Sequence, residues 1–222
     1  VSLAHKQIDR VIGGNDLVAV KDDLSNIPKR FQKYMSAIGK LSSGCTVNYI
    51  GQDIALTAGH CFWQTFFDEN LKTNESCSGD VILWQMTASP LVQHESKCVE
   101  IIAMQRSEAL GLDFAIIKVD NPPSVPLEVD WSSSLSKNPL FTIFSYPEEQ
   151  PLSWSRYCRS KPVELEKQLY PNQLHHLCDT KVGSSGAAVL NASNGKVIAL
   201  HRSGDGEFLT DGSMTQAIEN YA

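Results

Sequence analysis

The chain has 222 residues, 42% of them hydrophobic and 20% charged, and carries a formal net charge of −6 at pH 7. This composition is that of a globular protein with a sizeable core, and the modest, dispersed negative charge disfavours nucleic acid and anionic membranes as partners. No apolar run approaches the roughly 18 residues of a membrane-spanning helix, and residues 1–10 lack the apolar stretch of a signal peptide, so we expect that any export signal has been removed.

Short apolar runs, separated by turn residues, follow one another along the chain. Their length and β-branched content predict strands at residues 45–50, 54–57, 81–87, 114–119, 140–144, 187–190 and 196–200. Helical patterns are limited to residues 26–35, residues 58–63 and a short terminal helix over residues 214–221. The sequence therefore predicts an all-β fold of the barrel class, with the Pro- and Ser-rich residues 120–137 linking two halves.

The six cysteines favour disulfides over a zinc or redox site, because no two of them form a C-x-x-C pair. Each of three sequential pairings would close a loop of about twenty residues, worth about 3 kcal/mol in the chain-entropy model. Disulfides would place the protein outside the cytoplasm, secreted or periplasmic, whereas buried free thiols are the alternative. The favoured pairs among the fifteen possible connectivities are Cys45 with Cys61, Cys77 with Cys98, and Cys158 with Cys178.

Three short segments carry candidate chemistry. Residues 56–61, Leu-Thr-Ala-Gly-His-Cys, put His60 directly after a strand, and Asp113 opens an apolar strand where a buried carboxylate is costly unless something uses it. Residues 183–186, Gly-Ser-Ser-Gly, predict a tight turn that exposes the Ser185 hydroxyl beside backbone N–H groups able to bind an oxyanion. Alone, each could be a structural histidine, a turn aspartate or a Gly/Ser loop. Together, their order His, Asp, Ser indicates a Ser-His-Asp hydrolase.

These segments resemble the trypsin-like serine peptidases over roughly residues 11–220. Residues 58–61 are similar to their Ala-Ala-His-Cys, residues 113–115 to their Asp-(Ile/Leu/Phe)-Ala, and residues 183–186 to their Gly-Asp-Ser-Gly. The resemblance implies a peptidase domain over residues 11–222. It would contain two six-stranded antiparallel β-barrels, at about residues 11–120 and 138–213, with the triad between them.

The same resemblance implies a role for each residue. Ser185 would attack the scissile carbonyl, His60 would take and return the proton, and Asp113 would orient His60 and stabilise its imidazolium. The N–H groups of Gly183 and Ser185 would form the oxyanion hole. Protein or peptide would be the substrate, and no metal or organic cofactor would be required.

Within this class the closest resemblance is to the bacterial glutamyl endopeptidases. Residues 197–201, Val-Ile-Ala-Leu-His, are similar to their Ile-Gly-Ile-His, and residues 141–147 are similar to their Thr-Val-Thr-Gly-Tyr-Pro. The resemblance implies that an activating protease cuts after Arg10, residues 1–10 being a propeptide remnant. Thr180, His201 and the new Val11 ammonium would then bind a substrate Glu. Ser184 replaces the aspartate that pairs with the new N-terminus in trypsins, so that ion pair cannot form.

Three alternatives stay open. Asp179 lies six residues before Ser185, where trypsins place the aspartate that selects Arg or Lys. An inactive two-barrel protein that binds a partner through its old substrate site is the second alternative. The third, a metal site at His175, His176 and Cys178, is less favoured, because adjacent histidines on a strand point to opposite faces.

Overall fold

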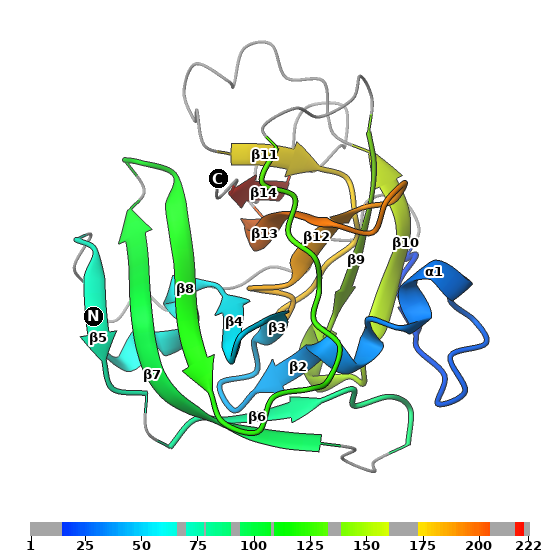
Figure 1. Cartoon of the computed structure of the whole chain (residues 1–222). Coiled ribbons are helices and arrows are strands. Elements are labelled where there is room, and N and C mark those ends of the chain that lie inside the picture. Colours follow the sequence, from blue (N-terminus) through cyan, green and yellow to red (C-terminus); the bar gives the residue numbers. More distant parts are fainter. Residues whose placement is uncertain are drawn as a thin grey trace.

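The computed structural model describes residues 15–65, 70–77, 79–89, 94–107, 109–132, 139–159, 173–204 and 216–219. In these ranges two antiparallel sheets of seven strands each form the two halves of the molecule (Figure 1). None of the helices described is long and apolar enough to cross a membrane. The helical elements are α1 (Lys29–Gln32) and the 3₁₀ turns Met35–Ala37, Gly59–Thr65 and Pro147–Glu149.

The first sheet closes on itself. Its order is β5-β7-β6-β2-β3-β4-β8, and β7 also pairs with β8, so six strands form the barrel predicted for the first half and β5 is added at one side. The predicted all-β fold of the barrel class is thereby confirmed for this half. The bounds are β2 Ile38–Leu41, β3 Thr46–Gly51, β4 Ile54–Thr57, β5 Lys72–Glu75, β6 Val81–Trp84, β7 His94–Ser107 and β8 Leu112–Val119.

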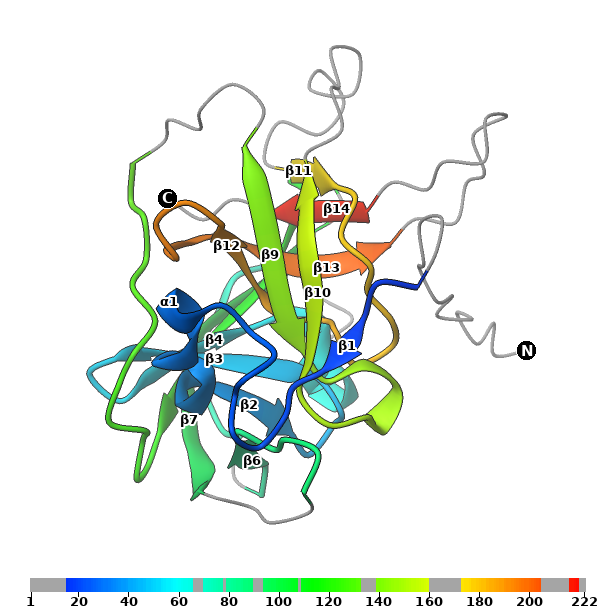
Figure 2. The same ribbon diagram turned by 90° about the vertical axis from the view of Figure 1, so that its right-hand side faces the viewer.

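The second sheet differs in two respects from the expected six-stranded barrel. Its order is β1-β10-β9-β12-β13-β14-β11, and within the described residues the ladder does not close between β10 and β11. Strand β1, expected in the first half, lies at the sheet edge beside β10 (Figure 2). The bounds are β1 Val18–Ala19, β9 Leu140–Ser145, β10 Ser153–Arg159, β11 Gln173–His176, β12 Ala188–Asn191, β13 Val197–Gly204 and β14 Gln216–Glu219.

The prediction of a terminal helix over residues 214–221 is wrong for residues 216–219, the part of this range that the structure describes. Gln216–Glu219 is strand β14, which pairs antiparallel with β13 on one side and β11 on the other. Backbone partners on both sides satisfy the N–H and C=O groups that a short isolated helix would leave unpaired at its ends.

The core continues from one half of the molecule to the other. Tyr146, just after β9 of the second half, is fully buried, and its phenol donates to the Ile38 carbonyl of the first half at 3.0 Å. The Met86 N–H donates to the same phenol oxygen at 3.0 Å. Burial raises the pKa of Tyr146, so the phenol is neutral and fixes the two halves relative to each other.

Three disulfides join Cys45 to Cys61, Cys77 to Cys98, and Cys158 to Cys178. These are the sequential pairs expected, and none of the six cysteines is free. The first links the start of β3 to the turn that carries His60. A metal site at Cys178 is disfavoured, since a disulfide sulfur has no thiolate to offer.

Candidate active site

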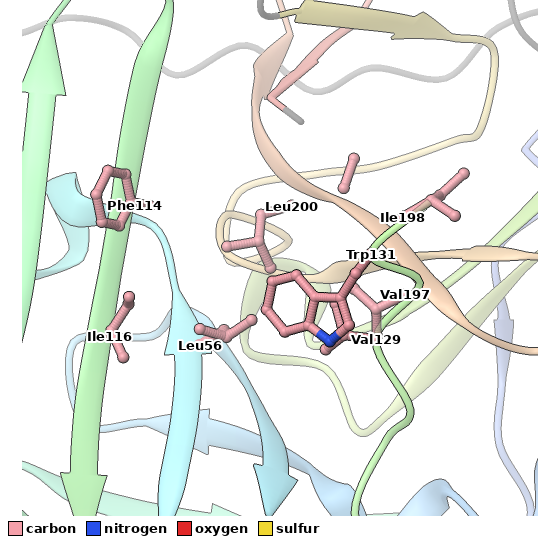
Figure 3. Close-up of a pocket in the computed structure, with 9 residues that line it drawn as sticks. Leu56, Phe114, Ile116, Val129, Trp131, Val197, Ile198 and Leu200 are labelled. Atoms are coloured by element: carbon pink, nitrogen blue, oxygen red, sulfur yellow. The ribbon is translucent and has the colours of Figure 1, made fainter. Parts of the chain in front are cut away.

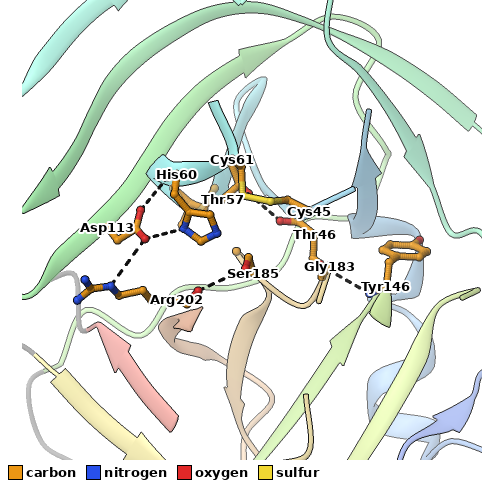
Figure 4. The surroundings of a disulfide bond; sticks show 12 residues. Cys45, Thr46, Thr57, His60, Cys61, Asp113, Tyr146, Gly183, Ser185 and Arg202 are labelled. Carbon is orange, nitrogen blue, oxygen red and sulfur yellow. Dashed lines mark hydrogen bonds and ion pairs between the residues drawn. A yellow bond between two sulfur atoms is a disulfide. The ribbon is translucent and has the colours of Figure 1, made fainter. Parts of the chain in front are cut away.

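His60 and Asp113 meet where β4 and β8 run side by side. Strand β8 alternates inward and outward, and the inward set contains Asp113 with Ala115 and Ile117. The backbone N–H of His60 donates to Oδ1 of Asp113 at 2.8 Å, and Nδ1 of His60 lies 2.6 Å from Oδ2 (Figure 4). A carboxylate can only accept, so Nδ1 carries the proton and Nε2 presents a lone pair.

Gly59 allows this approach of His60 to β8. A Cβ at position 59 would lie 2.9 Å from the carbonyl oxygens of Gln105 and Phe114 and 3.1 Å from Oδ1 of Asp113. The first two contacts are with backbone, which cannot move away cheaply. The chain therefore requires glycine where the trypsin-like motif has alanine.

Asp113 is ionised although only 2% of it is exposed. Burial alone would raise the pKa of Asp113, but the charge on His60, the two hydrogen bonds from His60 and the Arg202 guanidinium together outweigh burial and lower the pKa. The carboxylate can therefore stabilise a positive charge on the imidazole.

Ser185 rather than Ser184 has the environment of a nucleophile. The Ser184 side chain is fully buried, and its hydroxyl lies 2.9 Å from that of Ser145 and accepts from the Lys181 N–H at 3.2 Å. The Ser185 hydroxyl instead donates to the Arg202 carbonyl at 3.3 Å, a long bond that is readily exchanged. Nε2 of His60 is buried and has no hydrogen-bond partner among the described residues, so a proton acceptor is available.

The turn that carries Ser185 depends on two glycines. Gly183 has φ +91° and Gly186 φ +82°, and a Cβ on either would clash with backbone atoms, the Tyr146 carbonyl in one case and the Thr46 carbonyl in the other. In the described part of the chain, neither the Gly183 N–H nor the Ser185 N–H donates a hydrogen bond. Both are available as the predicted oxyanion donors.

Two polar residues of β3 clamp this turn from the first barrel, and the sequence analysis missed both. The Thr46 hydroxyl donates to the Gly183 carbonyl at 2.8 Å, and the Thr46 N–H donates to the Ser185 carbonyl at 2.9 Å. Asn48 donates to the Gly186 carbonyl at 2.6 Å and accepts from the Ala188 N–H at 3.0 Å. Their signal was an i, i+2 pair of polar residues in an apolar strand, which places both on one face.

Replacement of Asn48 by alanine should weaken both the fold and catalysis. The change leaves the buried Gly186 carbonyl and Ala188 N–H without their partner, which should lower the free energy of unfolding by about 2 kcal/mol and the melting temperature by about 4–8 °C. Turnover should fall more than substrate affinity, since the turn that positions Ser185 loosens. Asn191→Ala, which removes the same amide from a surface turn, is the control for calorimetry and kinetics; equal effects of the two changes would contradict the clamp.

The expected specificity residues lie around the same turn. Thr180 and His201 are buried, and the His201 backbone bonds to the two residues that follow Ser185, accepting from the Gly186 N–H at 2.7 Å and donating to the Ala187 carbonyl at 2.8 Å. Arg10 and Val11 lie outside the described residues.

A buried histidine pair was not foreseen. The Cys178 N–H donates to Nδ1 of His176 at 3.1 Å, and Nε2 of His176 lies 3.2 Å from Nδ1 of His201. The first bond puts the proton of a neutral His176 on Nε2, so His176 donates to His201. The proton of a neutral His201 is then on its Nε2.

An apolar pocket lies between the two halves (Figure 3). None of the described residues that line it has a titratable or nucleophilic side chain, so these residues do not supply the reacting groups. Phe114 contributes to it because successive strand residues face opposite sides, Asp113 lying on the inward face. The lining residues are Leu56, Phe114, Ile116, Val129, Trp131, Val197, Ile198, Ala199 and Leu200.

The closed first barrel and the second antiparallel sheet form a chymotrypsin-like fold, and His60, Asp113 and Ser185 lie near one another where the two halves meet (Figure 4). The family model of the trypsin-like peptidase domain matches residues 43–200, and the chain belongs to this family as a serine endopeptidase acting on protein or peptide. No curated protein sequence matches the chain.

Solved structures share the fold at low sequence identity. A Glu endopeptidase in complex with MPD is 20% identical with a TM-score of 0.68, covering 96% of this chain and 94% of its own. The protease Anisep from Arthrobacter nicotinovorans is 15% identical with a TM-score of 0.60, covering 86% and 92%. A thermostable serine protease, AL20, from an extremophilic microorganism is 13% identical with a TM-score of 0.60, covering 85% and 93%.

Proposed function

We propose that this serine endopeptidase is secreted and cleaves peptide bonds after Glu through an acyl-enzyme formed on Ser185. The observation that carries the proposal is the pair of His60 and Asp113, joined by two hydrogen bonds, in which Nε2 of His60 is buried and has no partner among the described residues. The three disulfides favour an oxidising compartment outside the cytoplasm.

The mechanism follows from these atoms. Nε2 of His60 takes the Ser185 hydroxyl proton as the oxygen attacks the scissile carbonyl, and Asp113 stabilises the imidazolium that forms. The N–H groups of Gly183 and Ser185 bind the oxyanion of the tetrahedral intermediate. The intermediate collapses to an acyl-enzyme as His60 returns the proton to the leaving amine. Water, activated by His60 in the same way, then releases the acid.

The buried histidine pair supports Glu at the cleavage site. A substrate carboxylate that enters an apolar pocket needs charge-assisted hydrogen bonds to offset its desolvation. Nε2–H of His201 would supply one, and His176 behind it fixes the tautomer. The Thr180 hydroxyl would supply a second, and a Val11 ammonium, released by a cut after Arg10, would add a full positive charge.

The position of Asp179 argues against Arg or Lys as the preferred residue. Its carboxylate is buried, and Oδ2 accepts from the backbone N–H of Asp16 at 2.6 Å. This residue is therefore already used to hold the N-terminal segment, a role that a specificity aspartate in an open pocket does not have.

Cleavage-site profiling on a denatured protein mixture tests the proposal. The chain starting at Val1 should be nearly inactive, and the chain cut after Arg10 should give products that end in Glu. His201→Ala removes the donor and should lower the Glu-to-Gln ratio of kcat/KM about tenfold to a hundredfold, the worth of one charge-assisted hydrogen bond. His94→Ala is the matched control, since His94 contacts the Asn121 carbonyl in the other half of the molecule. Products ending in Arg or Lys, or full activity in the uncut chain, would refute the specificity or the activation.

A further inference from the structure

Arg202 touches two members of the candidate triad. It follows His201 on β13, and its Nε lies 3.8 Å from Oδ2 of Asp113, the oxygen that also contacts Nδ1 of His60. The backbone carbonyl of Arg202 accepts a hydrogen bond from the Ser185 hydroxyl. The side chain is only 14% exposed, so the guanidinium is held against the carboxylate rather than extended into solvent (Figure 4).

We propose that Arg202 is a positioning residue of the triad, whose cation holds the Asp113 carboxylate and sets the lowest pH at which His60 can act as a base. The inference rests on the function proposed above, because it assigns Arg202 a role in that reaction. Neither composition nor spacing predicts this role, since an arginine in a sequence is usually a surface residue.

The physical basis is competition for one carboxylate. When His60 is protonated, both its imidazolium and the guanidinium face Asp113, and the two cations repel each other. A guanidinium keeps its charge at every pH at which the protein is folded, so its effect on His60 is constant. Arg202 therefore disfavours the imidazolium and extends the neutral, basic form of His60 to lower pH.

Other charged groups near Asp113 are few. The groups on the described elements packed around it are His60 on the turn after β4, Arg202 on β13, and Arg106, which is paired with Asp113 in the register of β7 and β8. Both His60 and Arg202 lower the pKa of Asp113, and of these two groups only the Arg202 guanidinium keeps its charge at every pH, so Arg202 is the fixed charge to change.

The experiment compares pH profiles of kcat/KM from about pH 4 to pH 9 for wild type, Arg202→Met and Arg202→Lys. Arg202→Met should move the midpoint of the acid limb to higher pH by about half a unit to one unit, because one nearby charge is removed. Arg202→Lys restores the charge and should return the midpoint toward wild type. Arg159→Met, at the exposed end of β10, removes the same charge elsewhere and should leave the midpoint unchanged.

Other outcomes would overturn the inference. An unmoved midpoint with activity reduced equally at every pH would make Arg202 a structural residue. A raised KM for Glu substrates with an unmoved midpoint would make it a ligand of the substrate carboxylate. If the Arg202→Met variant does not fold, Arg202→Gln, which retains hydrogen-bond donors, is used in its place.

A readout without turnover separates this inference from the proposed function. In a Ser185→Ala background, the titration of the His60 ring can be followed by ¹⁵N NMR with and without Arg202→Met. A higher titration midpoint in the double variant supports the role of Arg202 even if the wild-type chain hydrolyses nothing. An unchanged midpoint refutes it even if the wild type is an efficient peptidase.

Discussion

Ser185→Ala should abolish peptide hydrolysis while the fold is retained. Loss of the attacking oxygen leaves only oxyanion binding and substrate positioning, so kcat should fall by about a million-fold. Among the described residues the hydroxyl makes only a long bond to the Arg202 carbonyl, so the melting temperature should barely change. Kinetics on a Glu-containing peptide, together with circular dichroism, measure both quantities.

Ser184→Ala is the matched control for the neighbouring hydroxyl. It should keep activity within about tenfold but lower stability by about 1–3 kcal/mol, because the Ser145 hydroxyl and the Lys181 N–H lose a buried partner. Inactivation by Ser184→Ala and not by Ser185→Ala would overturn the choice of nucleophile. A processed, folded wild type that no fluorophosphonate labels would indicate an inactive binding protein.

Asp113→Asn should lower kcat by about four orders of magnitude at neutral pH. An amide can donate a hydrogen bond to Nδ1 of His60, which would put the imidazole proton on Nε2 and remove the lone pair that accepts from Ser185. The charge that stabilises the imidazolium is lost as well. Asp130→Asn, at a surface carboxylate bonded to Ser132, is the control. An Asp113→Asn enzyme that keeps a tenth of wild-type turnover would show that another group orients His60.

The strands that the sequence predicts are those with continuous apolar runs. The seven predicted runs all correspond to observed strands, β3, β4, β6, β8, β9, β12 and β13. Strand β7 was missed although it is the longest, since exposed charged residues interrupt it and its register shifts twice against β8. Strand β10 was missed because its inward positions include Ser153 and Ser155, which an apolar pattern does not detect.

The residues of the candidate site also fall into those that the sequence could predict and those that it could not. His60, Asp113 and Ser185 could be predicted because each lies in a short motif, and the structure brings them together. Thr46 and Arg202 could not, since their contacts join segments far apart in the chain and depend on how the two halves pack. The i, i+2 spacing of Thr46 and Asn48 places both on one face of β3, but no local pattern shows which distant turn they contact.

The bond between the Asp16 N–H and Asp179 fixes the chain just downstream of the proposed processing site. Val11 lies five positions before Asp16, so a new amino group at Val11 can move at most about 17 Å from that anchor. One group within a sphere of that radius corresponds to a local concentration of about 0.1 M. In the activation proposed above, even a site with millimolar affinity for the new ammonium would therefore be almost fully occupied. Residues 12–15 would not need to bind the protein themselves.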